Sequence, residues 1–170
     1  MAKPLANGFP MGAVMVSQAI ANEIKVGDHG ISIWYDYNSG TTFGGNPLAS
    51  RLAHNVFQRI SSPEMLAQIV STSSLFQSRL ANMAEKFPQI VDSIRGKGLL
   101  LGIQLKSVGN KSLGDLANLA VTKARRRGLL IITAGEGTIR LVPPLNIPEK
   151  VALDGLDILE SALEDVSRDI

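Results

Sequence analysis

The spacing of apolar residues after position 46 predicts two consecutive helices. In residues 47–60 an apolar residue recurs at every fourth position, which places these residues on one face of a helix. Residues 62–87 open with Ser62-Pro63-Glu64, a typical helix start that joins an N-cap, a proline and a first-turn acid. The predicted inward residues are Leu48, Leu52, Val56 and Ile60 in the first helix, and Leu66, Ile69, Phe76, Leu80, Met83 and Phe87 in the second, with Ser73 in the gap.

The rest of this pattern predicts two pairs of strands and two more helices. Apolar runs at residues 90–95 and 99–105 are separated by Gly-Lys-Gly, and runs at 129–133 and 138–142 by a glycine-rich turn. Helices are expected at residues 113–127, where Gly128 suits the position after the helix end, and at residues 147–166. Their predicted inward residues are Leu116, Ala117, Ala120 and Ala124, and then Leu156, Leu159, Leu163 and Val166.

The first 46 residues carry less periodic sequence. Residues 11–17 predict a short strand, and residues 18–24 a short helix. The strand pairs and helices after residue 46 predict a compact domain of the α+β type, within the broader mixed α/β class. The predicted boundary between the two parts therefore falls after residue 46.

Composition limits the classes of function. Of the 170 residues, 45% are apolar and 19% charged, which allows a core and argues against disorder along the whole chain. The net charge of +2 does not indicate nucleic-acid binding, and no apolar run approaches the roughly 20 residues of a membrane span. Without cysteine there are no disulfides or thiolate metal sites. His29 and His54 lie too far apart in sequence to suggest a metal pair, so no metal is expected.

The first candidate for chemistry is Lys3, which precedes a turn rich in glycine and proline and then an apolar run. A lysine on a rigid turn before a buried strand can be a covalent catalyst, because its amine forms a Schiff base with a carbonyl or with pyridoxal phosphate. The alternative is a solvated lysine. On spacing alone the solvated lysine is favoured, because single lysines in loops are common.

The second candidate is the hydroxyl- and glycine-rich stretch of residues 41–46. Thr41 and Thr42 lead into glycines and then Pro47, a residue that suits the first position of a helix. Backbone N–H groups, a hydroxyl and the helix N-terminus can together bind an anion. The alternative is an ordinary helix-capping loop, and the residues alone favour that alternative.

Several arginines and lysines are weaker candidates. Arg140 precedes Pro143-Pro144, and its guanidinium suits bidentate binding of a carboxylate, although a surface arginine on an edge strand is the alternative. Arg95 and Lys97 suit either a carboxylate or, more commonly, solvent. The triplet at residues 125–127 suits the negative end of a helix better than nucleic acid.

Four segments, taken together, favour the functional interpretations of these candidates over their alternatives. They are A-K-P-L-A-N-G-F-P-M-G-A at residues 2–13, G-D-H-G at 27–30 with T-T-F-G-G-N-P-L-A at 41–49, I-R-G-K-G-L-L-L-G at 94–102, and G-L-L at 128–130 with I-R-L-V-P-P-L at 139–145. Their residues and order resemble the class III, ornithine-type aminotransferases over nearly the whole chain. Within that family the sequence is most similar to acetylornithine aminotransferases, particularly the fungal ones.

The resemblance implies a pyridoxal-phosphate-dependent transferase of fold type I. Residues 1–46 would be a remnant of the large cofactor-binding domain, and residues 47–170 the small C-terminal domain. By the same resemblance, Lys3 binds pyridoxal phosphate covalently and acts as the base. Thr42, with Thr41 beside it, would contact the cofactor phosphate of the neighbouring subunit. Arg140 would lie in the active-site cleft and pair with an acid or a substrate carboxylate.

The implied reaction transfers the amino group of N-acetylornithine to 2-oxoglutarate, in arginine biosynthesis. The implied assembly is a homodimer with a shared active site. The implied location is the mitochondrial matrix, although the N-terminus carries no signal-peptide or transit-peptide pattern; the alternative location is the cytoplasm. Ornithine and 4-aminobutyrate are alternative amino donors. A non-catalytic interaction module is the alternative from another class of function.

The chain departs from the family pattern at residues 31–40, I-S-I-W-Y-D-Y-N-S-G, which separate two motifs that are normally continuous. This insertion is either a strand or hairpin arm, an aromatic partner-binding patch, or translated intron sequence. The last interpretation is favoured, because the motif rejoins cleanly when the ten residues are removed. A genuine insertion would disturb the adjacent phosphate site.

In the resembled family the lysine motif lies well past the middle of a chain more than twice as long. We therefore expect this chain to correspond to the C-terminal part of such an enzyme, either through an incomplete gene model or as a short product. The acid at the pyridine nitrogen, the stacking aromatic, the remaining phosphate donors and a substrate-carboxylate arginine lie upstream of the lysine in the family. The 170-residue chain is therefore expected to be inactive by itself.

Overall fold

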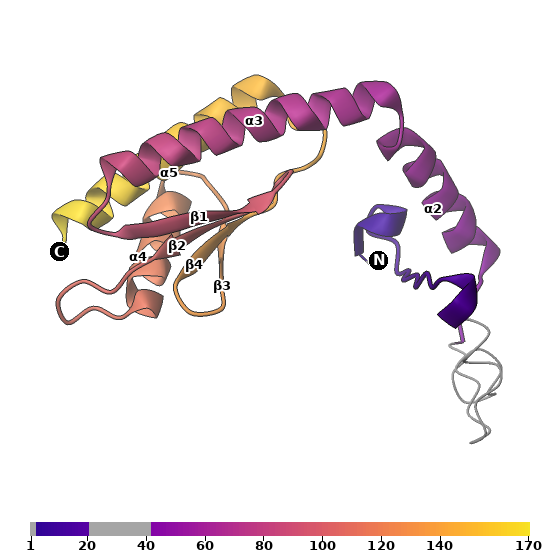
Figure 1. Ribbon diagram of the computed structural model, residues 1–170, viewed down its shortest axis with the longest axis horizontal. Coiled ribbons are helices and arrows are strands. Elements are labelled where there is room, and N and C mark those ends of the chain that lie inside the picture. Colours follow the sequence, from indigo (N-terminus) through magenta and orange to yellow (C-terminus); the bar gives the residue numbers. More distant parts are fainter. Residues whose placement is uncertain (1–2, 21–41) are drawn as a thin grey trace, which may run out of the picture. The chain divides into compact units, whose positions relative to one another are not determined.

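The computed structural model describes residues 3–20 and 42–170, with Lys3 and Pro4 described through their backbone alone (Figure 1). The chain forms two compact units, Met1–Ser62 and Pro63–Ile170. By its contacts, the helix Pro47–Ile60 belongs to the first unit. The domain boundary predicted from the sequence instead precedes this helix, after residue 46. The domain assignment itself stays a prediction.

The C-terminal unit is an antiparallel sheet of four strands in the order β1-β2-β4-β3, packed against helices (Figure 1). All the strands and helices predicted for this unit are confirmed in type. Strand β3 is displaced by a few residues towards its turn, because only there does it pair with β4. The elements are α3 (Pro63–Lys86), β1 (Val91–Lys97), β2 (Leu100–Leu105), α4 (Leu113–Arg126), β3 (Ile132–Ala134), β4 (Thr138–Leu141) and α5 (Glu149–Arg168).

One face of the sheet forms the core with all three helices. Ile103 of β2 and Ile139 of β4 are fully buried. They share one apolar cluster with Leu80 of α3, Leu116 of α4 and Leu159 of α5. Every inward residue predicted for α4 and α5 is buried, because their apolar positions keep the helical period throughout.

Helix α3 follows its predicted stripe only in its C-terminal half. Phe76, Leu80 and Met83 are buried, whereas Leu66 is half exposed. The polar residue in the stripe, Ser73, is buried, and its hydroxyl donates a 2.9 Å hydrogen bond to the carbonyl of Gly98. This bond satisfies a buried hydroxyl and ties α3 to the turn between β1 and β2.

Helix α4 has a defined cap at each end. The backbone N–H of Asp115 donates to Ser112 Oγ at 3.2 Å, and the Asp115 carboxylate accepts from Ser112, which lowers the pKa of Asp115. At the other end Gly128 has φ +93°. The N–H of Gly128 donates to Arg125 O and that of Leu129 to Ala124 O, both at 3.0 Å. This is a Schellman motif, and it confirms the position predicted for Gly128.

Ion pairs join α5 to α3. Arg79 contacts Asp157 at 2.6 Å and Glu160 at 3.2 Å, and Lys86 contacts Glu160 at 2.7 Å. The Glu160 carboxylate is therefore shared by two cations of α3. Its hydrogen bond with Lys86, and then that with Arg79, lowers the pKa of Glu160.

In the N-terminal unit, η1 (Lys3–Ala6) packs against α2 (Pro47–Ile60). The helix predicted at residues 47–60 is confirmed, but its predicted inward face is wrong. Ala6, Ala49 and Ala53 are buried, whereas Leu48 and Leu52 are exposed and Val56 and Ile60 half-buried. The small alanines are the side chains that meet η1, so the leucine face has no cover within the described part of this unit.

The strand predicted at residues 11–17 is also wrong, since this segment has no regular secondary structure. A strand needs a neighbouring strand, and none of the described residues of this unit forms one; Val14 and Met15 are exposed. Of the helix predicted at 18–24, residues 18–20 are helical. Some sequence predictions lie outside the described residues, namely those for residues 21–24 of that helix, His29, the 31–40 insertion and Thr41.

Among the described helices, none has the length and apolar character to cross a membrane.

Gly137→Ala is expected to destabilise the C-terminal unit more than Gly135→Ala. Both glycines have positive φ, 75° and 56°, where alanine costs about 1–2 kcal/mol. A Cβ at residue 137 would lie 2.5 Å from Leu113 Cβ, whereas nothing lies within 4 Å at residue 135. We expect a loss of about 3 kcal/mol for Gly137→Ala in urea unfolding. Equal losses in the two variants would contradict the packing of this turn on α4.

Glu160→Gln is expected to lower the free energy of unfolding by about 1 kcal/mol at pH 7. Because the pKa of Glu160 is lower in the folded state, its stabilising effect is complete above the unfolded pKa, about 4.3, and is lost as pH falls through the folded pKa. Urea unfolding at pH 7 and pH 3 should show a smaller effect at pH 3. Asp154→Asn, in an exposed pair on α5, is the control, and a pH-independent loss for Glu160→Gln would refute the assignment.

Candidate functional site

Lys3 is the first residue of η1, a short 3₁₀ helix that ends in a tight turn. Asn7 and Gly8 both have positive φ, 51° and 96°, and the N–H of Phe9 donates to Ala6 O at 3.2 Å. Ala6 is buried in the contact with α2. The turn predicted after the lysine is therefore present, and the packing of its first residue, Ala6, on α2 anchors it.

The threonine- and glycine-rich stretch forms a turn that leads directly into α2. The N–H of Asn46 donates to Phe43 O at 3.3 Å, and Gly45 has φ +68°. Thr42 is exposed, and its hydroxyl has no hydrogen bond to another described residue. A free hydroxyl at the start of such a turn is available to a ligand.

The N-terminus of α2 follows this turn. Asn46 is the N-cap, and its side chain accepts from the N–H of Ala49 at 3.0 Å. Pro47 occupies the first helical position, as predicted. The helix therefore begins beside the glycine-rich turn, with its positive dipole end and early N–H groups at the same place.

The N-terminal unit contains a hollow of about 330 Å³ next to the glycine-rich turn and the start of α2. It is lined by the end of the lysine motif, by the glycine-rich turn and by the first turn of α2. Its lining residues are Pro10, Met11, Gly12, Phe43, Gly44, Gly45, Asn46, Ala49 and Ser50. Backbone N–H groups of a glycine-rich turn beside the positive end of a helix dipole are suited to a phosphate, so this lining fits the phosphate of pyridoxal phosphate.

Arg140 lies on β4 of the C-terminal unit, on the sheet face opposite the core. Its register partners are Gly102 on β2 and Ile132 on β3. It is exposed, and no residue of its unit, all of which is described, forms an ion pair or hydrogen bond with its guanidinium. An unpaired guanidinium with all its donors free suits a carboxylate.

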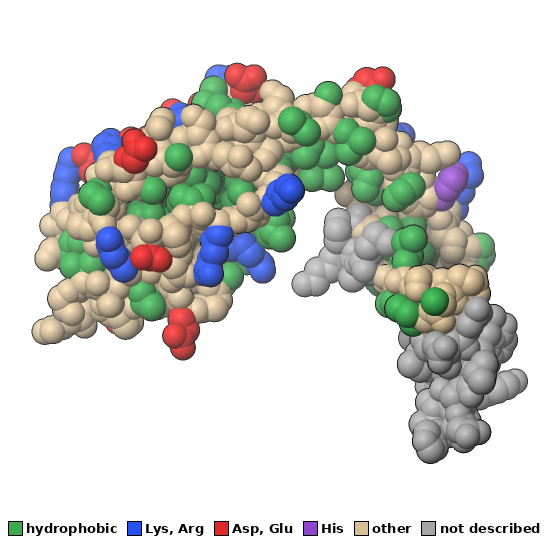
Figure 2. Space-filling view, in the orientation of Figure 1, with side chains coloured by type: hydrophobic (Ala, Val, Ile, Leu, Met, Phe, Trp, Pro, Cys, Tyr) green, Lys and Arg blue, Asp and Glu red, His purple; other side chains and the backbone are tan. Residues whose placement is uncertain are grey.

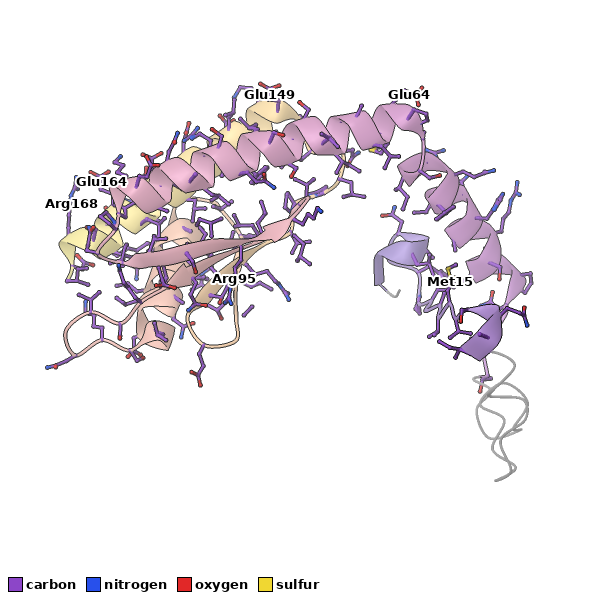
Figure 3. All side chains as sticks on the ribbon, in the orientation of Figure 1. Met15, Glu64, Arg95, Glu149, Glu164 and Arg168 are labelled. Atoms are coloured by element: carbon purple, nitrogen blue, oxygen red, sulfur yellow. The ribbon has the colours of Figure 1, made fainter. Side chains whose placement is uncertain are left out.

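Sequence reasoning missed a polar network beside Arg140. Arg95 Nη2 donates to Thr138 Oγ1 at 2.9 Å and to the side-chain oxygen of Gln104, and Thr138 Oγ1 donates to the same oxygen at 2.7 Å. Figure 3 shows Arg95 on the side of the sheet away from α3. Strand alternation was the available signal, because all three residues fall on the face opposite the apolar positions.

Comparison with known proteins places these features in a family. Residues 1–163 match the family described as aminotransferase class-III. The mitochondrial acetylornithine aminotransferase of Yarrowia lipolytica is 44% identical over the whole chain, which covers 37% of that protein. The chain thus spans about a third of the length of the curated relatives it matches.

Solved structures match in the same way. The acetylornithine aminotransferase of Elizabethkingia anophelis is 30% identical with a TM-score of 0.75, over 96% of this chain and 39% of that one. An ornithine aminotransferase of Toxoplasma gondii, reported with partial occupancy of pyridoxal phosphate at its active site, is 26% identical with a TM-score of 0.77, over 99% and 36%. The fold is therefore shared along nearly the whole chain.

Asn46→Ala is expected to loosen the first turn of α2 beside the hollow. Loss of the N-cap costs about 1 kcal/mol, or roughly a fivefold rise in amide exchange. Hydrogen–deuterium exchange of the Ala49 amide measures this effect. Asn55→Ala removes an exposed hydrogen bond to Arg59 on the same helix and should change that amide less; an equal rise in both variants would exclude a specific capping role.

Proposed function

We propose a function from the premise that this chain belongs to the class III aminotransferases. The complete protein would transfer the amino group of N-acetylornithine to 2-oxoglutarate with pyridoxal phosphate as cofactor, in arginine biosynthesis. The observation that carries this proposal is that the turns expected after Lys3 and before α2 are both formed. The names of the curated relatives support the substrate.

Lys3 would bind the cofactor covalently through its amine. The free amine of Lys3 would also serve as the base that takes the proton from the substrate Cα. Pyridoxal phosphate, when bound, supplies an electron sink for the bond broken at Cα. The turn after η1, held by Ala6 against α2, would limit the movement of the lysine.

Thr42 would donate its hydroxyl to the cofactor phosphate, with Thr41 beside it. The N–H groups of the glycine-rich turn would supply further donors, beside the positive dipole end of α2. By analogy with the family, this phosphate belongs to the active site of the neighbouring subunit of a homodimer. The dimer and its shared site are part of the proposal.

Arg140 would bind a substrate carboxylate or an acid of the active site. Its exposed guanidinium has no partner in its own unit, which leaves both edges of the fork for a planar anion. A mitochondrial location is proposed from the names of the fungal relatives.

Two other functions have some support. An ornithine or 4-aminobutyrate donor would use the same residues, but the ornithine aminotransferase is 26% identical whereas the acetylornithine relative is 44% identical. A non-catalytic interaction module is favoured by the exposed apolar residues of both units. N-Acetylornithine therefore remains the preferred donor.

The 170-residue polypeptide is expected to bind pyridoxal phosphate at Lys3 without catalysing transamination. It covers 37% of its Yarrowia relative, and catalysis needs groups that the family supplies upstream of the lysine. The measurements are the absorbance of lysine-bound cofactor, the mass of the Lys3 peptide after borohydride reduction, and turnover of N-acetylornithine with 2-oxoglutarate.

The matched control for Lys3→Ala is Lys97→Ala, on a strand of the other unit. Loss of the absorbance band and the modified peptide only in Lys3→Ala would support the assignment. Equal labelling of several lysines would overturn the role of Lys3. Measurable turnover by the purified 170-residue polypeptide would refute its expected inactivity.

A further inference from the structure

The turn that follows Lys3, called the lysine turn and formed by residues 6–9, has asparagine and glycine at its centre. Asn7 is the only asparagine of the chain that is followed directly by glycine. The carboxamide of an asparagine can react with the backbone nitrogen of the next residue, which makes asparagine thermolabile. A glycine in the second position offers no side chain to hinder this reaction. The sequence therefore marks Asn7 as a candidate for spontaneous deamidation.

Solvent reaches the two reacting groups. Asn7 and Gly8 are both exposed, and a Cβ placed on Gly8 would meet no atom within 4 Å. The side chain of Asn7 forms no hydrogen bond with another described residue. Neither steric cover nor a hydrogen-bond partner among the described residues thus protects the Asn7 carboxamide.

The backbone conformation of Asn7 does protect it. Asn7 has φ 51° and is the only residue other than glycine with a positive φ in the described part of the chain. This φ belongs to the left-handed α region, which asparagine tolerates and in which ψ is about +30 to +60°. At such a ψ the Gly8 nitrogen lies nearly opposite the Asn7 Cβ across the Cα–C bond. Ring closure needs this nitrogen beside Cβ, so the closed turn holds the reacting atoms apart.

Two contacts keep the lysine turn closed. The N–H of Phe9 donates to the carbonyl of Ala6 at 3.2 Å, across the Asn7–Gly8 pair. Ala6 is buried where η1 packs on the face of α2 that carries Ala49 and Ala53. A single short turn on small side chains forms few contacts, so it opens more readily than the whole unit unfolds. Undocking of η1 frees the ψ angle of Asn7.

We propose that Asn7 is a deamidation site and that the packing of η1 on α2 keeps it closed. In the open turn the Gly8 nitrogen attacks Asn7 Cγ. The N–Cγ bond forms, Gly8 gives its N–H proton to solvent, and Asn7 Nδ2 leaves as ammonia. Water then opens the five-membered ring, either at Cγ to give aspartate or at the main-chain carbonyl to give isoaspartate. One water is consumed and one ammonia released, without an oxidant, a cofactor or a second enzyme.

Either product introduces a carboxylate into the lysine turn, and isoaspartate also lengthens its backbone. The described residues of the N-terminal unit contain no aspartate or glutamate, and Figure 2 shows no acidic side chain over α2 on the face in view. The turn leads into Pro10, Met11 and Gly12, which line the hollow of this unit. A negative charge beside that hollow disfavours a phosphate. This consequence rests on the proposed function, whereas the modification does not.

The test follows Asn7 during incubation of the 170-residue chain at mildly alkaline pH without cofactor, in buffer and in urea. Peptide mass spectrometry, with fragmentation that separates aspartate from isoaspartate, measures the rate. We expect Asn7 to react before every other asparagine, and about tenfold faster in urea than in buffer. Asn7→Gln should abolish the signal at this position, because its larger ring closes more slowly.

A pair of leucine variants on α2 tests the role of packing. Ala53→Leu overfills the buried face that meets η1 and should raise the rate at Asn7 in buffer about tenfold. Arg51→Leu, at an exposed position of the same helix, should leave the rate unchanged. Hydrogen–deuterium exchange of the Phe9 amide measures the opening of the turn independently and should rise in the same proportion. Circular dichroism verifies that both variants are folded.

Each negative result has a defined meaning. An Asn7 that stays intact in urea, or that reacts no faster than the other asparagines there, would overturn the site. Equal rates in buffer and urea, or in Ala53→Leu and Arg51→Leu, would overturn its protection by η1. The incubation contains no cofactor, so a failure to label Lys3 would refute the proposed function and leave this inference intact.

Discussion

The C-terminal unit depends on the burial of one face of its sheet beneath three helices. Fully burying a side chain such as Ile103 or Ile139 contributes about 1.5–3 kcal/mol, and the core cluster contains many such residues. Because side chains alternate along a strand, this burial also decides which residues point the other way. Gln104, Thr138 and Arg140 reach the sheet face opposite the core because their neighbours in sequence are in the core.

The same alternation links stability to function. The core face of β2 and β4 is uniformly apolar, so these strands cannot shift by one residue without burying Arg140 and exposing its neighbours. The face opposite the core is then free to carry groups that would be costly in a core, including guanidinium groups without a carboxylate partner. Arg95 shows how such a group is held, since Thr138 and Gln104 fix its position without neutralising its charge.

The N-terminal unit builds its candidate site mainly from backbone. A glycine-rich turn, a helix N-terminus and the end of the lysine motif line one hollow, and none of the lining residues is charged. Such a site accepts a phosphate through oriented N–H groups and the helix dipole. The family expected from four motifs is confirmed, and with it a fold shared with class III aminotransferases of known structure.

Sequence alone determined the elements of residues 63–170, the core faces of α4 and α5, the capping role of Gly128 and the family. These features depend on local periodicity, on local backbone geometry or on motif residues that can be read in order. Only the tertiary structure decided which face of α2 is buried, that residues 11–17 are not a strand, and that Arg95 joins Gln104 and Thr138. Each of these depends on which segment lies across from the residue, and contacts between segments distant in sequence leave no periodic pattern in either one.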